Sequence, residues 1–207
     1  MGMAIIVAIS LTGCVAGDTL GTAWERQIEE PLLNYVVLTQ EIVWPLTGDS
    51  ISRMLELWFV PPNRFKACYG EPDSQIIVAD GTRLWTYAPE NRQVLVQEQG
   101  SELTWRDSPL GHLLKVEPAT VRTDTTLEGR LGQLLTWLDE SGECQFTRVE
   151  AFVPFGEQWP WRARLVDVGG NSTTYSLLRW HREPASADID GIFVLDIPRG
   201  VEIVPLD

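Results

Sequence analysis

Residues 74–97 read SQIIVADGTRLWTYAPENRQVLVQ and carry the clearest structural signal in the chain. Asp80-Gly81 lies between two apolar segments, and this dipeptide favours a tight turn between antiparallel strands. Pro89-Glu90-Asn91 gives a second turn signal before another apolar segment. The stretch therefore predicts three consecutive strands joined by two turns.

Large apolar residues occur on both faces of these predicted strands. In the middle strand, Leu84 points to one face, while Trp85 and Tyr87 point to the other. In the first strand, Ile77 points away from both of its apolar neighbours. An antiparallel sheet over an ordinary core needs only one apolar face, so the second face must serve some further purpose.

The rest of the chain also reads mainly as strands. In 52–60, Leu55, Leu57 and Phe59 share one face, and Trp58 and Val60 share the other. Residues 64–69 alternate in the same way, with Phe65 opposite Arg64. Further extended segments are expected at 38–44, 130–139, 144–153, 161–168, 173–181, 192–197 and 201–206. Short strands at this spacing predict one antiparallel sheet, strongly curved or closed.

Two segments have helical character. One begins at about Thr22 and is expected to continue into the thirties. The other follows Ser108-Pro109, a cap followed by a first-turn proline, and places Leu110, Leu113 and Leu114 on one face. The second segment is predicted to be a short amphipathic helix between strands.

Composition limits the classes of function. The chain has 207 residues, within the size of a single domain, and its net charge is −13. Nucleic-acid-binding proteins show a basic footprint, so this charge argues against a nucleic-acid partner. It argues equally against an electrostatic attraction to anionic membranes.

The first residues resemble an export signal. An apolar run from Ala4 to Leu11 is too short to cross a bilayer and fits the core of a signal peptide. The run ends in Leu11-Thr12-Gly13-Cys14, which looks like a bacterial lipobox whose cysteine, Cys14, would be lipidated. The alternative is an ordinary signal peptide with a chance cysteine. In either case Cys68 and Cys144 enter an oxidising compartment, where they form a disulfide or remain buried thiols.

The sequence offers little that suggests catalysis. Its two histidines, His112 and His181, lie near no matching set of metal ligands. Sequence motifs for a nucleophile elbow, a phosphate-binding loop or a zinc protease are absent. We therefore expect a protein that is not an enzyme and has no catalytic residue, cofactor or metal.

Residues 55–96 resemble the LolA family of periplasmic lipoprotein carriers. The resemblance rests on apolar, turn and aromatic positions at matching spacing. These are Leu57-Trp58, Pro62-Asn63, Phe65, Pro72, Asp80-Gly81, Leu84-Trp85, Tyr87 and Pro89. Weaker similarity extends to the helix at 108–114 and to the ending FVLDIPRGVEIV at 193–204.

This resemblance implies a fold and a function. The fold would be an unclosed antiparallel β half-barrel with a short helical lid over an apolar cavity, in one domain spanning 20–207. The cavity would hold the acyl chains of lipoproteins that cross the periplasm to the outer membrane. Partners would be acylated lipoproteins, an inner-membrane release complex and an outer-membrane acceptor, with the carrier a monomer. The residues expected to contact lipid are Trp58, Phe65, Ile77, Trp85, Tyr87, Leu110, Leu113 and Leu114.

Two positions depart from the family pattern. The family often has an arginine before the Pro-Asn turn that latches the lid, and this chain has Pro61 there, so Arg64 becomes the latch candidate. A lipidated Cys14 would make the protein an anchored acceptor rather than a soluble carrier. Two alternatives are a lipid-anchored lipid-binding or sensing module of the same fold, and a structural envelope lipoprotein with a filled core.

Overall fold

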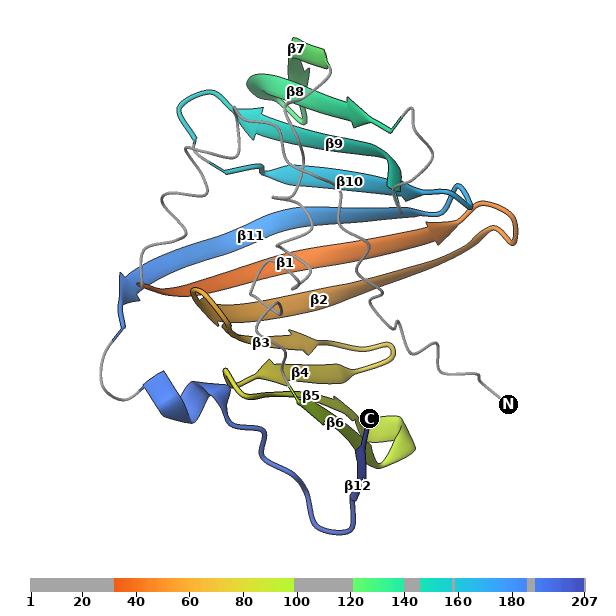
Figure 1. Cartoon of the computed structure of the whole chain (residues 1–207). Coiled ribbons are helices and arrows are strands. Elements are labelled where there is room, and N and C mark those ends of the chain that lie inside the picture. Colours follow the sequence, from red (N-terminus) through yellow and green to blue (C-terminus); the bar gives the residue numbers. More distant parts are fainter. Residues whose placement is uncertain (1–31, 99–120, 140–145, 158, 186–188, 207) are drawn as a thin grey trace.

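A computed structural model describes residues 32–98, 121–139, 146–157, 159–185 and 189–206. They form a single sheet of twelve strands (Figure 1). The strands are β1 Leu32–Trp44, β2 Asp49–Val60, β3 Arg64–Tyr69, β4 Gln75–Ala79, β5 Arg83–Ala88, β6 Gln93–Glu98, β7 Val121–Leu127, β8 Arg130–Leu138, β9 Phe146–Pro154, β10 Arg162–Asp167, β11 Ser172–Pro184 and β12 Glu202–Pro205.

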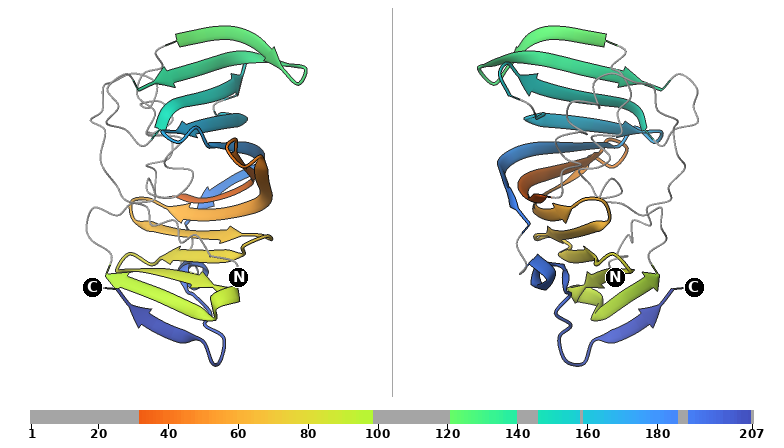
Figure 2. Two further views of the ribbon diagram at one scale, coloured as in Figure 1. Left: turned by 90° about the vertical axis from the view of Figure 1, so that its right-hand side faces the viewer. Right: turned by 60° about the vertical axis from the view of Figure 1, so that its left-hand side comes forward.

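The sheet does not close into a barrel. Its order is β12-β6-β5-β4-β3-β2-β1-β11-β10-β9-β8-β7, so β12 and β7 are the two edges. These edge strands lie at opposite ends of the molecule (Figure 2). All neighbouring strands are antiparallel except β12, which pairs in parallel with β6. The unclosed mainly β fold is confirmed, and the closed alternative is wrong.

The hairpin predicted from residues 74–97 is present as β4, β5 and β6. Asp80 stabilises its first turn, because Oδ1 accepts hydrogen bonds from the backbone N–H groups of Thr82 and Arg83 at 2.7 and 2.8 Å. Gly81 has a φ of +101°, a conformation that glycine adopts without strain. Oδ2 of the same aspartate accepts a bond from Trp85 Nε1 at 2.9 Å.

The sheet has two apolar faces, each with its own cluster of buried side chains. In each strand, every second side chain points to the inner face. Examples are Leu57 of β2 and Phe65 of β3, and the cluster on this face reaches Leu135 of β8. The outer face takes the opposite set, including Val60 and Val78. The assignment of Leu84 to one face and Trp85 to the other is confirmed.

The outer cluster is covered by residues 189–195, here called the cover segment. It begins with a 3-10 helix, η3, at Ile189–Phe193. Phe193 is 2% exposed and packs with Leu33, Val60 and Val78 of the sheet. The strand predicted at 192–197 is therefore wrong, because these residues cover a face of the sheet and do not extend its edge. The last strand of the chain is β12.

The two predicted helices have different outcomes. The helix expected from Thr22 into the thirties is wrong from Leu32 onward, because β1 begins there and pairs along its length with β2 and β11. The lid helix with Leu110, Leu113 and Leu114 lies outside the described residues. Within the described ranges the only helical elements are η3 and a short 3-10 helix, η1, at Pro89–Asn91, so a helical lid has no support there.

The strand β7 was not predicted. Most of its residues are exposed, so the sequence lacks the apolar alternation that reveals a strand. No helix among the described residues is both long enough and apolar enough to span a bilayer.

Candidate functional site

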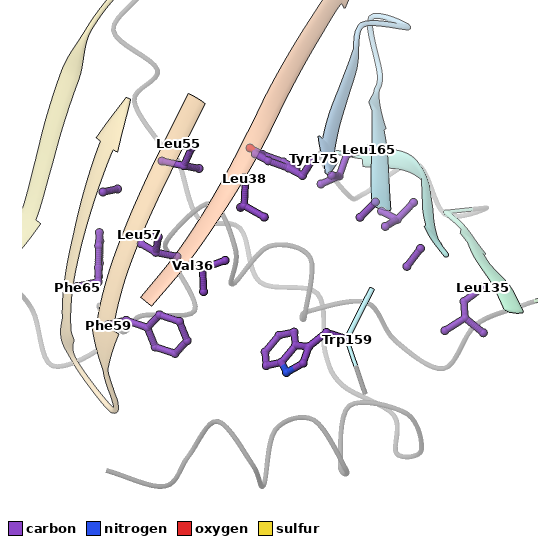
Figure 3. Close-up of a cluster of buried hydrophobic side chains, with 14 of the residues drawn as sticks. Val36, Leu38, Leu55, Leu57, Phe59, Phe65, Leu135, Trp159, Leu165 and Tyr175 are labelled. Atoms are coloured by element: carbon purple, nitrogen blue, oxygen red, sulfur yellow. The ribbon is translucent and has the colours of Figure 1, made fainter. Parts of the chain in front are cut away.

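The inner face brings together apolar side chains from strands far apart in the sequence. Val36 and Leu38 of β1 lie in the middle, because β1 is a central strand of the sheet. Figure 3 shows side chains from β1, β2, β3, β8 and β11 around this region. The fully or nearly buried members include Leu55, Leu57, Phe59, Ala67, Ala163 and Leu165.

Trp159 covers this surface from a connection rather than from a strand. It lies between β9 and β10 and is 7% exposed. Its ring meets that of Trp180 edge to face, with centroids 3.9 Å apart and an interplanar angle of 82°. The hollow beside them, lined also by Val36, Leu38 and Leu177, has an interior volume of about 10 Å³. That is room for about one water molecule, so an acyl chain enters this hollow only if the surrounding side chains move.

A polar group borders this apolar surface along β1. Gln40 follows Leu38 on the same face and pairs across the sheet with Arg53 and Tyr175. Arg53 Nε donates to Gln40 Oε1 at 2.7 Å, and Gln40 Nε2 donates to the Tyr175 hydroxyl oxygen at 2.8 Å. Arginine has only donors, so it fixes the orientation of the Gln40 amide and makes the tyrosine oxygen an acceptor.

Arg53 makes two further contacts with uncharged groups. Its Nη1 donates to the carbonyl oxygen of Asp73 at 3.2 Å, and its guanidinium lies 4.4 Å from the ring centroid of Tyr69. Burial raises the pKa of Tyr175 to about 12 and that of Tyr69 further still, so both hydroxyls stay protonated at neutral pH. Within the described ranges, Arg53 has no carboxylate partner.

The other end of β1 also carries a polar group. Asn34 is fully buried and pairs with Phe59 and Arg182. Its Nδ2 donates to the carbonyl oxygen of Leu32 at 3.0 Å. Among the described residues, Asn34 Oδ1 and Trp180 Nε1 have no hydrogen-bond partner. The apolar stretch of the inner face is thus bounded by polar groups at both ends.

The sheet separates the residues expected to contact lipid. Phe65 and Ile77 belong to the inner cluster, and Phe65 is 3% exposed. Trp58 and Trp85 belong to the outer cluster, with Tyr87 beside them by strand alternation. These five residues therefore do not share one surface, because neighbouring positions on a strand point to opposite sides.

Arg64 also lies on the outer face. Its Nη2 donates to Asp190 Oδ1 at 2.8 Å, and its guanidinium lies 4.7 Å from the Phe193 ring. The arginine therefore contacts the cover segment at both Asp190 and Phe193. Cys68 of β3 is a free, half-buried thiol whose pKa is raised by burial. Cys14 and Cys144 lie outside the described residues.

Sequence reasoning missed the residues that complete the inner site. Alternation places Gln40 and Arg53 on the inner face of their own strands, but only the register of β1 and β2 sets them opposite each other. Trp159 gave no such signal, since it comes from a connection whose path depends on the sheet. Within the described ranges there is no cluster of three or more metal-ligating side chains.

Comparison with known proteins agrees with this architecture. A family model described as "Outer membrane lipoprotein carrier protein LolA" matches residues 56–190. An outer-membrane lipoprotein carrier protein from Xanthomonas oryzae pv. oryzae is 33% identical over 132 residues, which cover 61% of this chain and 60% of that protein. One from Xanthomonas axonopodis pv. citri is 32% identical over 149 residues, covering 69% and 68%. The match thus spans less than two thirds of the first relative.

A solved structure shows the same fold. An uncharacterized conserved protein from Thermus thermophilus superposes with a TM-score of 0.55 at 12% identity, covering 89% of this chain and 99% of that one. The family model alone accounts for well over half of the sequence, from β2 to the start of the cover segment. The chain belongs to the LolA family of outer membrane lipoprotein carrier proteins.

Proposed function

We propose that this protein binds the acyl chains of lipoproteins on its inner face and carries or accepts them in the periplasm on their way to the outer membrane. The observation that carries the proposal is the continuous apolar surface around Val36 and Leu38, to which strands from both halves of the sheet contribute. The names of the relatives in Xanthomonas support the nature of the cargo.

Binding over Val36 and Leu38 would have to displace side chains that now surround the hollow beside them. Trp159 is the best candidate, because it lies on a connection and can move without breaking strand pairing. Phe65 and Ile77 would then contact the chain from β3 and β4. We propose that Leu110, Leu113 and Leu114, which are not among the described residues, close over the acyl chain.

The energetics favour reversible transfer. Burying one methylene group is worth about 0.8 kcal/mol relative to water, but the acyl chain moves from a membrane to a protein surface. The apolar contributions of the two environments nearly cancel, so a modest preference suffices for loading and still permits release. We propose that an inner-membrane release complex loads the protein and that an outer-membrane acceptor receives the cargo.

A lipidated Cys14 would instead make the protein an anchored acceptor, or a lipid-binding or sensing module. Mass spectrometry of the membrane-derived protein distinguishes these roles. An acylated Cys14 at the mature N-terminus supports the anchored forms. An unmodified N-terminus downstream of Cys14 supports the soluble carrier with a signal peptide at 1–14 and a domain at 20–207.

Two adjacent leucines provide a matched test of the binding surface. Leu177 belongs to the inner face, and Leu178 is 59% exposed. Leu177→Asp should weaken binding of a triacylated lipopeptide at least tenfold, while Leu178→Asp should change it less than twofold. Circular dichroism would verify that both variants keep the sheet. Equal binding by the two folded variants would refute the inner face as the site.

A further inference from the structure

Arg53 is an unusual residue for the border of an apolar surface. It is half-buried, and its described contacts are to an amide oxygen, a backbone carbonyl oxygen and an aromatic ring. A fully buried positive charge is normally paired with a carboxylate, whereas a half-buried arginine can keep part of its head group open to solvent or to a ligand. The whole chain carries 29 acidic residues against 16 basic ones, so the lack of such a pair among the described residues is not due to a shortage of acids.

The guanidinium retains the capacity to bind an anion. Five N–H groups are available on arginine, and the described hydrogen bonds use Nε and Nη1. Gln40 holds the group in place from the neighbouring strand. Because Gln40 donates to the Tyr175 oxygen, the hydroxyl hydrogen of Tyr175 is directed elsewhere and can bind a second acceptor.

The position links this polar group to the apolar surface. Along β1, Gln40 follows Leu38 and Val36 on the inner face, and Tyr175 itself lines the hollow beside Trp159. Two residues along a strand span about 7 Å, so a chain lying over Val36 and Leu38 reaches this group within a few methylenes. An acyl chain with an anionic end would satisfy both surfaces together.

We propose that Arg53, held by Gln40 and assisted by the Tyr175 hydroxyl, binds the oxyanion of an anionic single-chain lipid whose acyl chain lies on the inner face. The site rests on the proposed function for its apolar part, and it adds a charge preference that an acylated lipoprotein does not require. A carboxylate on the end of a fatty acid and a phosphate on a lysolipid share the necessary chemistry. Charge-assisted hydrogen bonds of this kind are worth about tenfold to hundredfold in affinity.

The test measures the affinities of palmitate and methyl palmitate for the full-length protein by displacement of a neutral apolar dye. The two ligands have the same chain and differ in charge. Palmitate should bind about tenfold to hundredfold more tightly. Arg53→Gln should abolish this preference while changing methyl palmitate affinity less than twofold, and Arg53→Lys should retain part of it. Arg164→Gln removes a charge from an exposed outer position and should leave the preference unchanged.

Tyr175→Phe provides a second variant that keeps the shape of the side chain if Arg53→Gln does not fold. It should reduce the preference several-fold. Equal affinities for palmitate and its ester in the unaltered protein would overturn the oxyanion site but leave the acyl-binding function intact. An undiminished preference in folded Arg53→Gln would overturn it as well. Failure of both palmitate and its ester to displace the dye, together with no binding of the triacylated lipopeptide, would overturn both proposals. Comparing palmitate with a lysophosphatidic acid then distinguishes the carboxylate from the phosphate source.

Discussion

Arg64 and Asp190 join two segments that are 126 residues apart, through a hydrogen-bonded ion pair of 2.8 Å. The arginine also lies over Phe193, whose ring is buried against the outer face of the sheet. The large apolar residues on the second face of the hairpin therefore have a partner in the chain itself. The outer face forms a second core, and the inner face is left as the candidate surface for lipid.

The ion pair and the buried ring should contribute very differently to stability. The Asp190 side chain is 81% exposed, so Asp190→Asn should lower the free energy of unfolding by less than ~0.5 kcal/mol. Phe193→Ala removes a buried ring and should lower it by about 3–5 kcal/mol. Urea denaturation of both variants checks the ranking. A larger loss for Asp190→Asn would mean that charge rather than packing holds the cover segment.

Phe65 should behave as a core residue when it is given a charge. It is 3% exposed, so Phe65→Glu places an unpaired carboxylate among apolar side chains and should lower the unfolding free energy by several kcal/mol. Lys66→Glu on the adjacent outer position should cost less than about 1 kcal/mol. Thermal denaturation followed by circular dichroism measures both changes. A folded Phe65→Glu protein of near-normal stability would instead mean that the ring lies at an open position on the inner face and not in a packed core.

Removing the Trp159 side chain should lower stability and raise lipid affinity. Trp159→Ala removes a buried indole and should lower the unfolding free energy by about 3–5 kcal/mol. It also vacates the surface over Val36 and Leu38, so the folded fraction should bind a neutral acyl ligand more tightly than the unaltered protein does. Denaturation and dye displacement are measured on the same preparation. If ligand affinity falls while the sheet remains intact, Trp159 is part of the binding surface rather than its occupant.

Asp80 should make the hairpin sensitive to acid. Burial acts to raise the pKa of its carboxyl, but hydrogen bonds from Trp85, Thr82 and the Arg83 backbone outweigh it and lower the pKa. A lowered folded-state pKa stabilises the protein above the unfolded value of about 3.9, and this stabilisation is lost as pH falls through the folded value. Asp80→Asn should therefore destabilise at pH 7, and its difference from the unaltered protein should shrink below about pH 4. A constant difference between pH 7 and pH 3 would contradict this linkage.

The sequence predicted the sheet better than the site. Alternation and turn chemistry located β4, β5 and β6 to within about a residue, because both signals are local. Face assignment also succeeded, as Leu84 and Trp85 illustrate. The residues expected to contact lipid came from both faces. Alternation assigns residues to two faces, but it does not show which face is covered by another segment of the chain. Phe193 answers that question only through a contact distant in sequence.

Trp159, Gln40 and Arg53 illustrate the remaining limit. The position of Trp159 depends on how a connection folds over a completed sheet, which local patterns do not encode. Gln40 and Arg53 look like ordinary polar residues in their own strands, and they become a site only when the register of β1 and β2 places them opposite each other.

Photo-crosslinking tests most directly whether acyl chains bind to the inner face. A lipopeptide with a diazirine in its acyl chain is bound to the full-length protein, irradiated and mapped by mass spectrometry, with an unacylated peptide as control. Adducts are expected on inner-face residues such as Leu38, Ile77 and Leu177. Adducts confined to Trp58, Trp85 and Tyr87, with the inner face unlabelled, would contradict binding at the inner face.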